Sequence, residues 1–222
     1  MMQTGLSGYW HTHNLWITWS PKCGLTTMNH LYTDYKKLHK KNYNCNDDTK
    51  IITIIRNPLE RAISIFNYNM YRLPYTVDGI DRLNERESEP RYYELFKTIR
   101  KKYPDPPTSW YNDSIDETKF LFWLNEILPI SIENDGHSMR QNTSWQYPNQ
   151  LQTRSKYWTL ENLNKHLLKV FGYTSNKQYQ NFGKYNKEKM TTLLSLPNVK
   201  KKLIEYYYTD NIIYNTAKQK YK

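Results

Sequence analysis

Apolar residues fall into two short runs near the start of the chain. Residues 15–19 predict a short buried strand, and residues 51–55 are a continuous β-branched run, which is typical of a parallel strand buried on both faces. Between them, residues 26–37 have an apolar side that predicts a helix. The order strand, helix, strand predicts a right-handed crossover, and therefore an α/β fold with a central, mostly parallel sheet flanked by helices.

The start of the next helix has the clearest local signals in the chain. Asn57 suits the N-cap, Pro58 suits the first helical position, and Glu60 completes a capping box. We therefore expect a helix to begin at Pro58.

Apolar stripes predict four more helices, over residues 91–102, 116–128, 161–171 and 198–221. We expect Pro129 to end the second of these, and residues 134–152 to form a loop. Because residues 72–114 are charged and rich in proline, they are predicted to be an insertion or lid over a cleft.

Composition narrows the class of protein. A chain of 222 residues predicts a single domain over residues 1–222, and 21 Tyr and 7 Trp provide large surfaces to bury despite a mean hydropathy of -0.91. The 2 Cys lack metal-ligand spacing with the 6 His, so we expect no metal and a reducing compartment. Without a signal peptide or the roughly 18 apolar residues of a membrane span, the expected location is cytoplasmic.

The formal net charge of +11 predicts a field that attracts phosphate, sulfate or polyanions. Basic residues are spread along the whole chain, with short runs at residues 100–102 and 200–202 and no long basic tail. A nucleic-acid-binding module that stacks bases on the many tyrosines is therefore an alternative and not the leading hypothesis.

The turn after the first strand has the parts of an oxyanion site. A loop that leaves a strand and enters a helix directs backbone N–H groups at one spot, where the helix dipole adds positive charge. Lys22 adds a full charge, Gly24 permits close backbone approach, and Thr26 and Thr27 provide hydroxyl donors. The alternative is an ordinary turn in which Gly24 serves only the bend.

A second junction follows the second strand. Arg56 ends that strand and Ser64 lies two turns into the next helix, so a guanidinium fork and a hydroxyl can converge on one phosphate. Arg61 either assists them, or is a solvated helix residue, or is an intrahelical partner of the neighbours of Glu60.

Two common nucleotide motifs are absent from the sequence. No Gly-Lys-Ser or Gly-Lys-Thr occurs, which counts against a small kinase of P-loop ancestry as an alternative. The 7 glycines do not form a dinucleotide fingerprint either.

The two junctions resemble the nucleotide motifs of sulfotransferases. Residues 21–27, P-K-C-G-L-T-T, resemble the 5′-phosphosulfate loop, and residues 56–64, R-N-P-L-E-R-A-I-S, are similar to the 3′-phosphate motif. Residues 137–141, 159–163 and 207–214 occupy the places of later elements of carbohydrate sulfotransferases. The resemblance therefore covers nearly the whole chain, although only the first two motifs are specific.

This resemblance implies a P-loop-like sulfotransferase fold that binds 3′-phosphoadenylyl sulfate (PAPS) and releases 3′-phosphoadenosine 5′-phosphate (PAP). The expected acceptor is a carbohydrate hydroxyl, with neither nucleic acid nor membrane as a partner, although the family's Golgi members have a membrane anchor. Leu25 departs from the small or hydroxyl residue of many relatives, and Cys23 is either a small loop residue or a thiol of lowered pKa. The implied nucleotide-binding residues are Lys22, Cys23, Gly24, Leu25, Thr26, Thr27, Arg56, Arg61 and Ser64.

In the implied reaction an acceptor hydroxyl attacks sulfur in line while PAP departs, and Lys22 stabilises the charge on the bridging oxygen. His137 is the first candidate for the general base, because it lies in a polar loop with Arg140 and Gln141 and titrates near neutrality. His39 and Asp34 remain alternatives.

Overall fold

The computed structural model describes residues 7–10, 14–19, 23–24, 27–28, 31, 48–72, 90–104, 117–134, 138, 141, 156–173 and 187–220. The chain divides into two compact units, each made of separate stretches of sequence. The first comprises Met1–Asn57, Arg140–Tyr179 and Thr209–Lys222, and the second comprises Pro58–Met139 and Gln180–Tyr208. The single domain over residues 1–222 stays a prediction.

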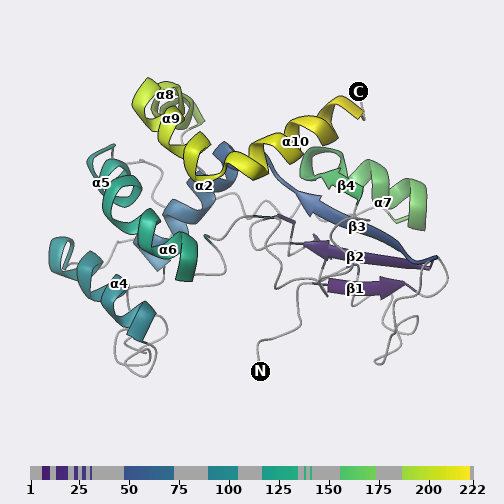
Figure 1. The fold of residues 1–222 in the computed structure, drawn as a ribbon, viewed down its shortest axis with the longest axis horizontal. Coiled ribbons are helices and arrows are strands. Elements are labelled where there is room, and N and C mark those ends of the chain that lie inside the picture. The colour runs from purple at the N-terminus through teal and green to yellow at the C-terminus, as the bar shows by residue number, and fades with distance from the viewer. Residues whose placement is uncertain are drawn as a thin grey trace. The chain divides into compact units, whose positions relative to one another are not determined.

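A four-stranded sheet organises the first unit (Figure 1). Its strands lie in the order β1 (Ser7–Trp10), β2 (Leu15–Trp19), β3 (Lys50–Ile55) and β4 (Lys156–Thr159). β1 runs antiparallel to β2, whereas β2, β3 and β4 are parallel. The mixed α/β class and the parallel pairing of residues 15–19 with residues 51–55 are confirmed; β1 and β4 were not predicted.

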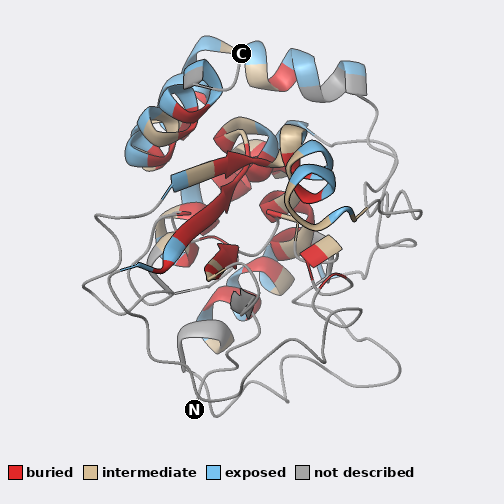
Figure 2. Ribbon diagram, turned by 90° about the vertical axis from the view of Figure 1, so that its right-hand side faces the viewer, coloured by how far each residue is buried: buried red, intermediate tan, exposed pale blue. Residues whose placement is uncertain are grey.

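Helices cover both faces of β3, which is buried from Ile51 to its end (Figure 2). On one face, Ile52 and Ile54 share a core cluster with Met28 and with α7 (Leu163–Phe171). On the other, Ile55 packs against Tyr214 of α10 (Tyr208–Lys220). Two-sided burial explains why β3 is a continuous β-branched run without polar alternation.

The second unit is helical in the part that the structure describes. Its elements are α2 (Pro58–Asn67), the π-helical segment η3 (Tyr68–Arg72), α4 (Pro90–Lys102), α5 (Glu117–Phe122), the π-helical segment η4 (Trp123–Ile127), α6 (Leu128–Asn134), α8 (Lys187–Ser195) and α9 (Pro197–Tyr206). The predicted start of α2 at Pro58 is confirmed.

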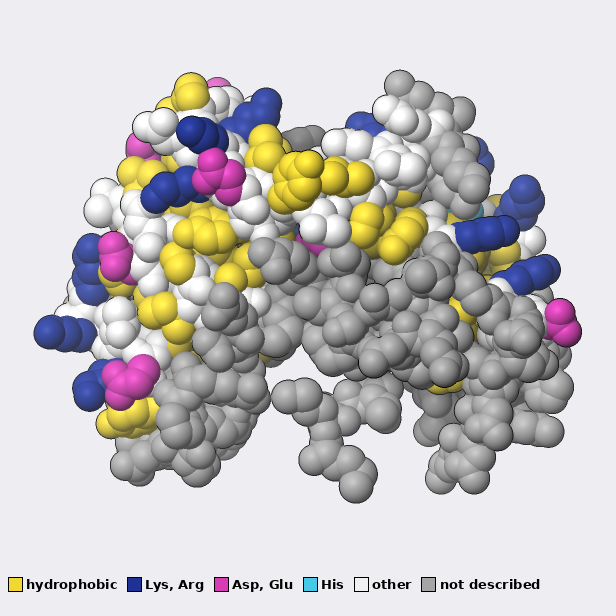
Figure 3. All heavy atoms as spheres, viewed as in Figure 1, with side chains coloured by type: hydrophobic (Ala, Val, Ile, Leu, Met, Phe, Trp, Pro, Cys, Tyr) yellow, Lys and Arg dark blue, Asp and Glu magenta, His cyan; other side chains and the backbone are white. Residues whose placement is uncertain are grey.

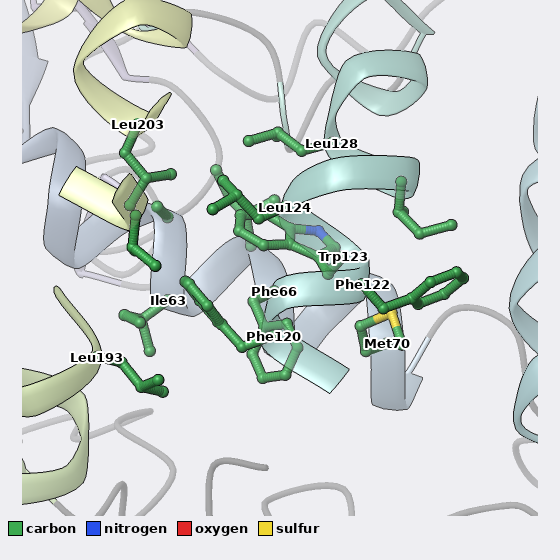
Figure 4. Packing of buried hydrophobic residues seen from close by; sticks show 14 of the residues in the cluster. Ile63, Phe66, Met70, Phe120, Phe122, Trp123, Leu124, Leu128, Leu193 and Leu203 are labelled. Carbon is green, nitrogen blue, oxygen red and sulfur yellow. The ribbon is translucent and has the colours of Figure 1, made fainter. Parts of the chain in front are cut away.

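Aromatic side chains form the centre of this unit's core (Figure 4). Phe66 of α2 meets Phe120 and Trp123 edge to face, with ring centroids 5.0 and 5.7 Å apart. Leu203 of α9 packs into the same cluster. Leu95, Phe96 and Ile99 of the helix predicted over residues 91–102 are buried here too, so α4 belongs to this core. Residues 73–89 and 105–114 of the predicted lid lie outside the described residues.

The helix predicted over residues 116–128 does not end at Pro129, so that prediction is wrong. The helical path widens in η4, where the Leu128 N–H bonds to the Trp123 carbonyl, and it continues as α6 to Asn134. Pro129 falls in the first turn of α6, where a backbone N–H needs no partner within that helix.

The single helix predicted over residues 198–221 is also wrong, because α9 and α10 are separated at Tyr207. Tyr207 has φ −110° and ψ 33°, its ring is buried in the core of the second unit, and its hydroxyl donates to the Ser138 carbonyl at 2.8 Å. These tertiary contacts outweigh helix propensity, and no Gly or Pro marks the break in the sequence.

Helix α7 falls within the predicted residues 161–171. A 3-10 turn, η7 (Leu160–Asn162), leads into it, and Gly172 caps it in a left-handed conformation.

Candidate functional site

The turn after β2 is a strand-to-helix junction built around Gly24. Gly24 has φ +84°, and its carbonyl accepts a 3.0 Å hydrogen bond from the Met28 N–H, so helical hydrogen bonding begins directly after it. A β-carbon at this position would lie 3.0 Å from Leu160 Cδ1 and 3.1 Å from Leu163 Cδ2. The positive φ favours glycine, and the two leucine side chains leave little room for a β-carbon. Lys22, Leu25 and Thr26 lie outside the described residues, whereas Thr27 begins the helical turn.

Arg56 lies at the same edge of the sheet, since it follows the carboxyl end of β3, the parallel neighbour of β2. Its backbone makes two hydrogen bonds to one side chain. The Arg56 N–H donates to Gln141 Oε1 at 2.6 Å, and Gln141 Nε2 donates to the Arg56 carbonyl at 2.9 Å. Gln141 thus pairs with Arg56 as a neighbouring strand would.

Gln141 also contacts the β2 turn and helix α10. Cys23 Sγ donates to Gln141 Oε1 at 2.9 Å, and the Gln141 N–H donates to both carboxylate oxygens of Asp210, at 2.8 and 3.0 Å. We call Gln141 and these three partners the Gln141 bridge. All four residues are buried. The bridge joins the ends of β2 and β3, and it gives Cys23 a structural role.

A further hydrogen bond ties α10 to the segment before α7. The Tyr214 hydroxyl donates to Glu161 Oε1 at 2.9 Å. Hydrogen bonds therefore connect the three later sequence elements. Gln141 and Asp210 join residues 137–141 to residues 207–214, and the bond from Tyr214 to Glu161 joins residues 207–214 to residues 159–163.

Sequence reasoning placed Gln141 and Asp210 within motifs but gave neither a role. One signal was available, because Tyr207, Asp210, Tyr214 and Ala217 recur at helical spacing and all are buried. A carboxylate in the middle of an apolar helical stripe needs hydrogen-bond donors when buried. The identity of its partner had no local signal.

Arg61 and Ser64 belong to α2 in the second unit. Arg61 is buried, with its guanidinium carbon 5.9 Å from the centroid of the Tyr207 ring, so the interpretation of a solvated surface residue is wrong. Ser64 is half-buried. The convergence of Arg56 and Ser64 on one phosphate stays a prediction.

The segment after the predicted base is tightly held in the second unit. Ser138 is fully buried; Asn69 Nδ2 donates to its hydroxyl oxygen at 3.0 Å, and the Tyr207 hydroxyl donates to its carbonyl. His137 itself lies outside the described residues, as do Arg140 and the alternative bases His39 and Asp34.

One histidine with no predicted role has a distinct environment. His166 of α7 stacks on Trp158 with ring centroids 4.7 Å apart and an angle of 7° between the planes. Burial lowers the pKa of His166 from its ordinary value of 6.5, and the charges of Lys165 and Lys169 lower it further.

Among the described residues, no three His, Cys, Asp or Glu side chains gather closely enough to hold a metal ion. None of the helices described is long and apolar enough to cross a membrane. Comparisons with protein-family models, with curated proteins and with solved structures found no match.

Proposed function

We propose that this protein is a sulfotransferase that moves a sulfuryl group from PAPS to an acceptor hydroxyl, with a carbohydrate as the expected acceptor. One observation carries the proposal: the Gly24 turn and Arg56 follow neighbouring parallel strands, and one carboxamide joins them. Two motifs that resemble opposite ends of a PAPS site thus begin side by side. A strand-to-helix turn is a favourable place for an oxyanion, because its N–H groups and dipole point at the ligand.

In this proposal the 5′-phosphosulfate binds at the turn of residues 21–27, and Arg56 with Ser64 binds the 3′-phosphate. The acceptor oxygen attacks sulfur, the bond from sulfur to the bridging oxygen breaks, and PAP leaves with the bond electrons. Lys22 stabilises the charge on that oxygen. The acceptor proton passes to a base, for which His137 is the first candidate and His39 and Asp34 are alternatives. Such a base accelerates transfer by about 10² to 10⁴.

Nucleotide binding is the first test, and thermal unfolding measures it. PAP at 100 times its Kd stabilises a protein that binds it by about 2.7 kcal/mol. We expect this stabilisation with PAP and none with ATP–Mg²⁺ or with a short oligonucleotide. Stabilisation by ATP–Mg²⁺ alone would instead support a phosphoryl-transfer enzyme.

The described part of the second unit gives no support to the nucleic-acid alternative on the face that Figure 3 shows. There, at the left of the view, Lys and Arg side chains of the second unit lie among Asp and Glu. Within α4, Lys97 Nζ and Glu94 Oε1 form an ion pair at 3.8 Å. Stabilisation by the oligonucleotide alone would overturn this reading.

Catalysis is the second test, and Lys22→Ala is its variant. Removing a donor that stabilises transition-state charge lowers kcat by about 10²- to 10³-fold. We expect that loss in the transfer of radiolabelled sulfate to a panel of glycans, tyrosine peptides and small alcohols. Lys50→Ala is the matched control, because Lys50 is exposed and begins β3 at the end away from Arg56. Equal activity of the two variants would remove Lys22 from the mechanism.

A further inference from the structure

The Gln141 bridge holds Arg56 more completely than a single hydrogen bond would. The N–H and the carbonyl of Arg56 belong to the two peptide groups on either side of its α-carbon, and both bond to the same carboxamide, at 2.6 and 2.9 Å. Fixing both peptide groups fixes the direction of the bond from the α-carbon to the β-carbon. The base of the Arg56 side chain is therefore set before any ligand arrives.

The carboxamide can bind in one orientation only. Gln141 Oε1 accepts from the Arg56 N–H and from Cys23 Sγ, while Nε2 donates to the Arg56 carbonyl. Turning the amide over would place an NH₂ group against the Arg56 N–H and an oxygen against the Arg56 carbonyl, and both contacts are repulsive. The hydrogen-bond pattern thus assigns the atoms of the amide.

Asp210 holds Gln141 in turn. Both carboxylate oxygens accept from the Gln141 N–H, and the Asp210 side chain is only 2% exposed. Burying a carboxylate is costly unless hydrogen bonds compensate, and bonds to a charged acceptor are stronger than neutral ones. That carboxylate accepts from the main chain of Gln141, and the Gln141 side chain in turn bonds to the main chain of Arg56.

We infer that Gln141 is a positioning residue for anion binding and that Asp210 of α10 is the residue that holds it in place. Neither residue needs to touch the ligand. The bridge lowers the conformational entropy that Arg56 and the Cys23 turn would otherwise lose on binding. The identity of the ligand, the anion of a 3′-phosphorylated nucleotide, rests on the proposed function.

Hydrogen exchange at the Arg56 amide, measured by NMR without ligand, tests the positioning directly. We expect Gln141→Leu and Asp210→Ala each to speed this exchange by about tenfold or more, and the double variant to add little, because both changes break one chain of contacts. Asp210→Asn keeps an acceptor oxygen and should retain most of the protection. Thr49→Val is the control, since it removes the partly buried hydrogen bond from the Thr49 hydroxyl to Asn14 Oδ1, before the other end of β3.

Affinity for PAP, measured by calorimetry, tests the consequence for binding. We expect Gln141→Leu and Asp210→Ala to raise the Kd about tenfold, which corresponds to about 1.4 kcal/mol, and Asp210→Asn and Thr49→Val to leave it near the wild-type value. If Gln141→Leu does not fold, Gln141→Glu replaces it, because Glu keeps the length and the acceptor but cannot donate to the Arg56 carbonyl.

Each outcome decides one part of the inference. Unchanged Arg56 exchange in Asp210→Ala would overturn the role of Asp210, and unchanged exchange in the Gln141 variant would overturn the positioning. Faster exchange with unchanged PAP affinity would reduce the bridge to a structural role. If the wild-type protein does not bind PAP, the proposed function and the ligand of this site both fail, while the exchange rates still decide whether Gln141 and Asp210 position Arg56.

Discussion

Gly24 and Gly172 both have left-handed backbones, but their surroundings differ. A β-carbon at Gly24 would press on Leu160 and Leu163, whereas one at Gly172 would meet nothing within 4 Å. Gly172→Ala should therefore lower the free energy of unfolding only through backbone strain, by about 1–2 kcal/mol. Gly24→Ala adds overpacking, which costs about 1–3 kcal/mol more.

Urea denaturation of the two alanine variants measures this difference in the free energy of unfolding. Equal losses would show that the contacts of η7 and α7 with the Gly24 turn relax without cost.

His166 predicts a pH-dependent term in stability. Its pKa in the folded protein lies below the unfolded value of about 6.5, so between the two values the unfolded chain binds more protons. Stability from this residue is thus complete above pH 6.5, falls as the pH drops through that value, and levels off below the folded pKa.

His166→Phe keeps a ring to stack on Trp158 and has no proton to bind. We expect the free energy of unfolding, measured by urea from pH 5 to 8, to fall less steeply on acidification in His166→Phe than in the wild type. Parallel pH profiles of the two proteins would contradict the assignment.

Among the elements, the π-helical segment η4 places Trp123, Leu124 and Ile127 in the core, whereas the helix that follows it is partly exposed. Leu124 of η4 is 1% exposed and belongs to the core of the second unit, whereas Ile130 of α6 is 44% exposed. Leu124→Ala should cost about 2–5 kcal/mol, and Ile130→Ala should stay within about 0.5 kcal/mol. Thermal or urea unfolding distinguishes them, and similar losses would place Leu124 outside the core.

The elements that local signals specify were predictable. The β-branched run of residues 51–55 predicted β3, because burial on both faces requires apolar residues in succession. Asn57 and Pro58 predicted the start of α2, because helix capping depends on adjacent residues. β1 and β4 have only four residues each and no alternation, so they gave no such pattern. The helix end predicted at Pro129 was wrong because the π-helical segment η4 lets the helix continue. The unbroken helix predicted through Tyr207 was wrong because the buried contact of the Tyr207 hydroxyl depends on the tertiary structure.

At the scale of the whole molecule, the candidate site depends on contacts that no sequence window contains. Gln141 reaches Arg56 across 85 residues, Cys23 across 118 and Asp210 across 69. The strand ends and Gly24 were predictable from the two junctions. The residue that joins them was not, because amide and carboxylate side chains in loops and helices are common and their pairing is set by the fold.

The order of the bridge residues along the chain has a consequence for biosynthesis. Cys23, Arg56, Gln141 and Asp210 leave the ribosome in that order, and the first unit includes the late segment Thr209–Lys222. Strands β2 and β3 can pair early, but contacts of such long sequence separation form late. The edge that we propose binds the nucleotide is thus finished only after Asp210 has been made, so nascent chains that stop before α10 should reach a sheet without an ordered Arg56.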